Sequence, residues 1–233
     1  MIQPDVLREY MRRFIGFGSP KAPTWFIGLE QGGGENLAEL DRRLSAWVDV
    51  GAAPFGDFQE YCRRIGERRW HGDTPRIQST LGKLVRVVLA SQGIEPTPEV
   101  VRKYQAQRFG CANEQTVIAE LMPLPSRSLS DWIYAATGVP GLETRDAYVR
   151  EYRPLRTELL RAAISIYAPR AVVFMGLTES ETWAQIAASE FADGPAGALW
   201  ASSGVTRFVI AKHPTAFGAP NAYFDQIGRA LAA

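Results

Sequence analysis

Near its end the chain runs Phe208-Val209-Ile210-Ala211-Lys212-His213-Pro214-Thr215-Ala216-Phe217-Gly218. The apolar, β-branched run followed by a proline-containing turn predicts a buried strand that stops at the turn. His213 then stands at the carboxyl end of this strand, and it is one of two histidines in the chain. Its position makes the imidazole a candidate functional group.

A second segment has the same design. The apolar run Thr24–Glu30 leads into Gln31-Gly32-Gly33-Gly34 and the polar pair that follows. In a parallel α/β sheet the carboxyl ends of the strands converge on one crevice, and ligands bind there. We therefore expect the acid Glu30 and His213 to face a common pocket.

Strand and helix patterns alternate along the rest of the chain. Apolar runs predict strands at 24–29, 116–122, 171–175 and 206–211. Helical periodicity and capping signals predict helices at 4–15, 36–48, 80–93, 97–107, 144–167, 178–190 and 220–232. The alternation indicates an α/β protein, with helices on both faces of a four-stranded parallel sheet. We expect one domain over 1–233, with a long insertion at about 49–78.

Composition restricts the function classes. The chain has 233 residues, a net charge of +1 and 46% hydrophobic residues. It lacks an 18-residue apolar run and a signal-peptide pattern, so we expect a soluble, cytoplasmic monomer with no membrane contact. Cys62 and Cys111 are the only cysteines, which predicts free thiols, no metal and no cofactor. The arginine-rich segment 63–71 fits either phosphate contact or a solvated helix face.

Four motifs at strand ends resemble those of the uracil-DNA glycosylase superfamily, in the family's order. They are Gly28-Leu29-Glu30-Gln31-Gly32, Glu120-Leu121-Met122-Pro123-Leu124, the strand 169–176 that ends in glycine, and His213-Pro214-Thr215-Ala216-Phe217. The motifs are most similar to those of the single-strand-selective and modified-base branches. The resemblance implies a three-layer α/β/α fold and a monofunctional DNA glycosylase that hydrolyses the bond between sugar and base.

The resemblance also implies roles for individual residues. Glu30 would orient or deprotonate the attacking water, and His213 would donate a hydrogen bond to the base O2 as charge develops. Phe217 stands where the family has a wedge residue that fills the gap left by the flipped base. Backbone phosphates of duplex or single-stranded DNA would contact Ser126, Arg127, Lys212 and Thr215. The base itself would contact Gly28, Leu29, Gln31, Gly32, Glu120 and one of two aromatic residues, Phe55 or Phe58.

Two departures from the family pattern bear on the substrate. Glu120 replaces an amide that reads uracil, and an ionised carboxylate only accepts hydrogen bonds, which favours an exocyclic amine such as cytosine N4. Gly32 replaces an aromatic residue that closes the C5 side of the base. Together they predict a cytosine with a bulky C5 substituent, as in modified phage DNA. The cysteines that bind an iron–sulfur cluster in other branches are absent.

Other interpretations remain open. The protein is alternatively a uracil or hypoxanthine glycosylase, or a catalytically silent member that binds nucleic acid. In a second interpretation Glu30 interacts with the dipole at the N-terminus of the helix that starts at Asn36. In a third, the glycine run Gly32–Gly34 binds a phosphate. Each of three further residues also has a structural alternative. Glu120 would pair with an arginine, His213 would be a packed, hydrogen-bonded histidine, and Phe217 would belong to the core.

Overall fold

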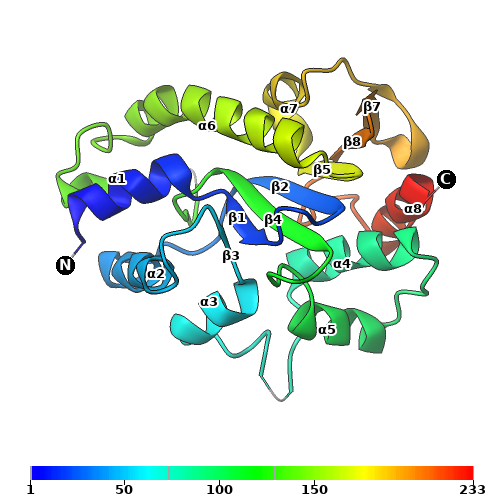
Figure 1. Ribbon diagram of the computed structural model, residues 1–233, viewed down its shortest axis with the longest axis horizontal. Coiled ribbons are helices and arrows are strands. Elements are labelled where there is room, and N and C mark those ends of the chain that lie inside the picture. Colours follow the sequence, from blue (N-terminus) through cyan, green and yellow to red (C-terminus); the bar gives the residue numbers. More distant parts are fainter. Residues whose placement is uncertain (1, 73, 129, 233) are drawn as a thin grey trace.

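A computed structural model describes residues 2–72, 74–128 and 130–232. At its centre is one sheet with the strand order β3-β1-β4-β2-β5-β8-β7-β6 (Figure 1). Its four middle strands are parallel neighbours: β4 (Thr116–Met122), β2 (Thr24–Glu30), β5 (Ala171–Met175) and β8 (Thr206–Ala211). They are the four strands predicted from the sequence, which confirms an α/β protein.

The expected strand number of four is too low, because the described residues form a sheet of eight strands. The additional strands are β1 (Gly16–Gly18), β3 (Phe55–Gly56), β6 (Ala192–Asp193) and β7 (Leu199–Ser203). Most of them are too short to show an alternating pattern. β1 is also glycine-rich because it lies close to β4: a Cβ atom on Gly16 would lie 2.1 Å from the Ile118 carbonyl oxygen.

Helices lie on both faces of the sheet, as Figure 1 shows. One core contains Trp25 and Ile27 with residues of α1 (Pro4–Arg13), α2 (Leu37–Asp49), α6 (Arg145–Tyr167) and α7 (Ser180–Ala187). The other contains Phe26 with residues of α4 (Ser79–Ser91), α5 (Pro98–Gln107) and α8 (Asn221–Ala232). Successive strand residues enter opposite cores because side chains alternate across a strand.

Helix starts follow the capping signals. The side chains of Asn36, Thr97 and Thr144 each accept a hydrogen bond from the backbone N–H three residues later, which satisfies a free donor of the first turn. The segment 49–78 contains β3 and α3 (Phe58–Arg64), with turns around them. None of the described helices is long and apolar enough to cross a membrane.

Candidate functional site

The parallel strands bring three predicted residues to one edge of the sheet. In the pairing of β2 with β4, Gly28 lies opposite Glu120 and Glu30 lies opposite Met122. His213 follows the end of β8, and β5 separates β8 from β2. Neighbouring strands are about 4.8 Å apart, so the ends of β2 and β8 are about 10 Å apart. This edge, with Glu30, Glu120 and His213, is the candidate site.

Glu30 is held by an ion pair. Arg145, the first residue of α6, donates from Nη2 to Oε1 of Glu30 at 2.6 Å, and 9% of the Glu30 side chain is exposed. The pKa of Glu30 is raised above its ordinary value, because the effect of burial outweighs the opposing effects of Arg145 and Arg153. The acid at the N-terminus of α2 is Glu39, which accepts from the backbone N–H of Glu35. The hydrogen-bonded acid at this helix terminus is thus Glu39, whereas Glu30 contacts Arg145 at the start of α6.

Glu120 lies over Gly28. A Cβ atom on Gly28 would lie 2.3 Å from Oε2 of Glu120, so the carboxyl group occupies the space that a side chain at position 28 would fill. This Oε2 atom is buried and has no hydrogen-bond partner among the described residues. Burial, followed by the charge of Glu30, raises the pKa of Glu120 to about 8. At neutral pH Glu120 therefore retains its proton, contrary to the ionised form assumed from the sequence.

The arginine beside Glu120 does not pair with its carboxylate. Arg156 is fully buried in α6, where its Nη2 donates to the backbone carbonyl of Glu120 and its Nε to that of Leu121, both at 2.9 Å. Burial lowers the pKa of Arg156 to about 10. Because the guanidinium is engaged with carbonyl oxygens, the structure does not support the interpretation of Glu120 as half of a side-chain ion pair.

His213 presents one ring nitrogen outward. Its Nδ1 atom lies 2.9 Å from Thr215 Oγ1 and accepts a hydrogen bond from the Thr215 backbone N–H at 3.3 Å. In a neutral imidazole one nitrogen accepts and the other donates, so the proton is on Nε2. Burial, followed by the charge of Lys83, lowers the pKa of His213. The neutral Nε2–H form is therefore the donor that the site offers.

The turn after His213 is tied to α4. Lys83 of that helix donates from Nζ to the carbonyl oxygens of Pro214 and, at 2.8 Å, of Ala219. Lys212 closes the same turn by donating from Nζ to the Gly218 carbonyl at 3.1 Å. These contacts fix the backbone that carries the imidazole.

The glycine loop after β2 is shaped by packing. Arg43 donates to the Gln31 side-chain oxygen at 3.2 Å and to the Gly32 carbonyl at 3.3 Å. Gly34 has a φ of +79°, and a Cβ atom there would lie 2.5 Å from the Pro125 carbonyl oxygen. The close approach and the positive φ explain Gly34 without a phosphate. Gly32 itself faces open space, with no atom within 4 Å of a Cβ placed on it.

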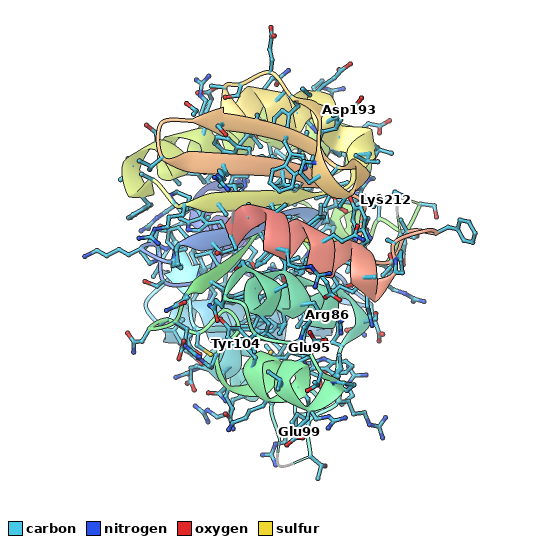
Figure 2. All side chains as sticks on the ribbon, turned by 90° about the vertical axis from the view of Figure 1, so that its right-hand side faces the viewer. Arg86, Glu95, Glu99, Tyr104, Asp193 and Lys212 are labelled. Atoms are coloured by element: carbon cyan, nitrogen blue, oxygen red, sulfur yellow. The ribbon has the colours of Figure 1, made fainter. Side chains whose placement is uncertain are left out.

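The residues expected to meet DNA surround this edge. Phe217 is fully exposed, at 104% of its reference area, so the core interpretation of this residue is wrong. Thr215 and Arg127 are also exposed, and Ser126 donates from its hydroxyl to the Ser128 carbonyl. In Figure 2 Lys212 lies beside α8. The labelled acids Glu95 and Glu99, just before and within α5, lie well away from Lys212.

The two candidate stacking residues lie in different places. Phe55 packs against Trp25, near the start of β2, with ring centroids 5.5 Å apart. Glu30 is five residues further along that strand, which is about 16 Å. Phe58 packs beside Ile118, since both approach Gly110, and Ile118 shares a sheet face with Glu120. Phe58 is therefore the better placed of the two.

The second histidine of the chain, His71, adjoins Phe58. The His71 ring meets Phe58 edge-on, with centroids 5.2 Å apart. Its Nδ1 donates to the Ala106 carbonyl at 3.1 Å, because a carbonyl only accepts. Nε2 is then the unprotonated nitrogen, and it is buried without a partner among the described residues.

Much of the charge in the arginine-rich segment is neutralised. Arg63 and Arg64 both pair with Glu60 at 2.7 Å, and Arg69 pairs with Glu67. These pairs favour the interpretation of 63–71 as a solvated surface.

Sequence reasoning missed the cations that organise the site, namely Lys83, Arg145 and Arg156. The chain has 26 lysines and arginines, and no motif distinguishes these three from the others. Arg145 directly follows the helix cap Thr144, so its place at the start of α6 was predictable, although its partner Glu30 was not.

A cavity of about 740 Å³ lies away from the candidate site. Segments 158–168, 186–188 and 203–208 line it. Because these segments include the start of β8, the cavity opens at the amino ends of the strands.

A comparison of the chain with protein-family models and with curated proteins finds no match.

Proposed function

We propose that this chain is a monofunctional DNA glycosylase that removes a C5-substituted cytosine flipped out of DNA. One observation carries the proposal. Three titratable groups lie at the ends of three parallel strands: Glu30, which is paired with Arg145; Glu120, whose buried Oε2 atom has no hydrogen-bond partner among the described residues; and His213. The pKa values of Glu30 and Glu120 are raised and that of His213 is lowered, and titratable groups with shifted pKa values that lie together are typical of acid–base sites.

Each group suits one step of the hydrolysis. Breaking the bond between C1′ and N1 leaves positive charge on the sugar and negative charge on the base. Glu30, which accepts a hydrogen bond from Arg145 and has a raised pKa that suits a base, orients water and accepts its proton while it offsets the sugar charge. His213 donates its Nε2 hydrogen to the base O2 as negative charge develops there. The exposed Phe217 fills the space that the base vacates.

The substrate is proposed from two features. Gly32 leaves the C5 side of the base open. The acid form of Glu120 presents an O–H donor and a carbonyl acceptor, which match N3 and the N4 amine of cytosine. Unmodified cytosine must be spared, so the C5 group has to supply part of the binding energy.

Release of uracil is the second candidate, and the protonation of Glu120 favours it. The same O–H donor and carbonyl acceptor match O4 and N3–H of uracil. The ionised carboxylate assumed from the sequence would repel O4, but the retained proton removes that objection.

The test is a panel of oligonucleotides scored for abasic sites. It contains uracil, hypoxanthine, cytosine, 5-hydroxymethylcytosine and glucosylated 5-hydroxymethylcytosine, each as single strand and as duplex. We expect release of the substituted cytosines and no release of cytosine. Efficient release of uracil with none of the substituted cytosines would support the second candidate, and DNA binding without abasic sites would indicate the silent one.

Three variants test the assigned roles. Glu30→Gln and His213→Ala should each lower base release by about a hundredfold or more, with unchanged thermal unfolding. Gly32→Tyr should exclude the substituted cytosines, because its ring would occupy the open C5 side. Near-normal release by any of these variants would remove that residue from the proposed mechanism.

A further inference from the structure

The two carboxyl groups of the site differ in their partners. Glu30 has a cation in contact, the guanidinium of Arg145 at 2.6 Å. Glu120, opposite Gly28 on the neighbouring strand, has a buried Oε2 atom with no hydrogen-bond partner in residues 2–72, 74–128 and 130–232. The charged groups that face Glu120 are Glu30 from β2 and Arg156 from α6. Arg156 directs its N–H groups at backbone carbonyls instead of the carboxyl group.

We propose that Glu120 is the general acid of the reaction, which transfers its proton to N3 of a cytosine-type base as the bond between C1′ and N1 breaks. This inference rests on the proposed function and assigns Glu120 a catalytic step in addition to base recognition. The unpartnered Oε2 atom, packed against Gly28 and close to Met175, is the atom that would carry the proton.

The leaving group explains why an acid is needed. Uracil carries a proton on N3 and departs as a stabilised anion. Cytosine has a lone pair on N3 and is a poor leaving group as an anion, so protonation of N3 lets it depart as a neutral molecule. An acid directed at N3 can therefore protonate a cytosine-type base. It cannot protonate uracil at this position, because N3 of uracil already carries a hydrogen.

The step balances. The proton moves from Glu120 to N3, and the electron pair of the C1′–N1 bond goes to the base. Water adds to C1′, and its proton goes to Glu30. The products are the neutral base and an abasic sugar, while Glu120 is left ionised and Glu30 protonated. Exchange with solvent restores both groups.

The surroundings of Glu120 favour this role. A neighbouring carboxylate and a buried position both stabilise the protonated acid, and burial raises the pKa of Glu120 to about 8. Such a group holds its proton at neutral pH and gives it up readily, the condition for efficient acid catalysis. Arg156 faces Glu120, has no ion pair within the part of the chain that the structure describes, and would stabilise the ionised product.

The experiment compares two bases with the same C5 group, 5-hydroxymethylcytosine and 5-hydroxymethyluracil, in otherwise identical oligonucleotides. Glu120→Gln retains a donor and an acceptor but cannot transfer a proton. In single turnovers we expect it to lower cytosine-type release by about a hundredfold or more and uracil-type release at most a few-fold. Wild-type release of the cytosine type should fall with one ionisation on the alkaline side, and this fall should be absent from the variant.

Equal losses on both bases, or an unchanged alkaline fall in Glu120→Gln, would overturn the inference. Glu95→Gln, a change at an exposed glutamate near α5, is the matched control.

A measurement without substrate separates the acid role of Glu120 from the proposed function. The infrared carbonyl band of a protonated acid should be present at pH 7 in the wild type and absent from Glu120→Gln. Base release without this band contradicts the acid role alone, whereas the band without any base release contradicts the proposed function.

Discussion

At the scale of single residues, neighbours decide which groups of the site carry charge. Glu30 and Glu120 have the same chemistry, but one lies beside Arg145 and the other over Gly28. The sequence located both acids and His213. It did not reveal their protonation, because this depends on Arg145, Arg156 and Lys83, which approach from other parts of the chain.

The protonation of Glu120 predicts a pH-dependent stability. Its pKa rises from 4.5 to about 8 on folding, so the folded protein binds this proton more tightly than the unfolded chain. The stabilisation is complete below pH 4.5 and is lost as pH rises to 8 and beyond. We expect Glu120→Gln to become progressively more stable than the wild type over this range, measured by urea denaturation at pH 5, 7 and 9. Parallel curves would contradict the assignment.

Lys83 predicts a change in His213 that can be measured without substrate. Its charge lowers the pKa of His213, in addition to the effect of burial. Lys83→Met should therefore raise that pKa, followed by nuclear magnetic resonance of the imidazole ring. The chain has two histidines, so a His71→Gln variant assigns both signals. Lys212→Met is the control, since Lys212 bonds the same turn, and an equal shift in both variants would contradict a specific role for Lys83.

At the scale of elements, α6 supports the candidate site along its length. Arg145 at its first residue holds Glu30, and Arg156 holds the end of β4 through two carbonyls. The position of α6 was predictable from Thr144 and its helical periodicity. The contacts of its arginines were not, because they depend on how the helix crosses the strands.

Loss of Arg156 should weaken the end of β4. Arg156→Met removes the guanidinium that donates to the carbonyls of Glu120 and Leu121, and a hydrogen bond to a charged group contributes about 1.5–3 kcal/mol. Burial of the cation opposes this gain, so we expect a net loss of about 3 kcal/mol in the free energy of unfolding, measured by urea denaturation. Arg156→Lys should recover part of it. A variant as stable as the wild type would mean that burial of the cation cancels both bonds.

The strands illustrate the limits of sequence prediction at this scale. The four central strands were located because each has five to seven residues and contains an apolar run. β3 and β6 have two residues each, and β1 is Gly-Phe-Gly. Such segments form strands only because a neighbour supplies hydrogen bonds, and this information is not local.

At the scale of the whole molecule, a net charge of +1 leaves DNA binding to the distribution of charge. Arg127 is exposed and forms no ion pair among the described residues, whereas Arg63 and Arg64 share Glu60. The sequence indicated basic residues in both places. It could not show which of them are neutralised, since each ion pair depends on side-chain geometry.

DNA affinity should fall steeply with salt, because phosphate contacts release counterions. We expect Arg127→Gln to reduce the slope of log affinity against log salt concentration by about 1. Arg63→Gln, whose residue is already paired with Glu60, should change it less. Binding is measured with Glu30→Gln to avoid base release. A flat salt dependence would mean that DNA is not the ligand.

The hydrogen bond between Lys83 and Pro214 joins residues that are 131 positions apart in the sequence. The one between Arg145 and Glu30 joins residues that are 115 positions apart. Contacts of such long range require most of the chain to be arranged before they form, and they slow folding. The geometry around Glu30 and His213 should therefore be completed late, after the helices. During refolding from denaturant, recovery of base release should lag behind recovery of the helical circular-dichroism signal.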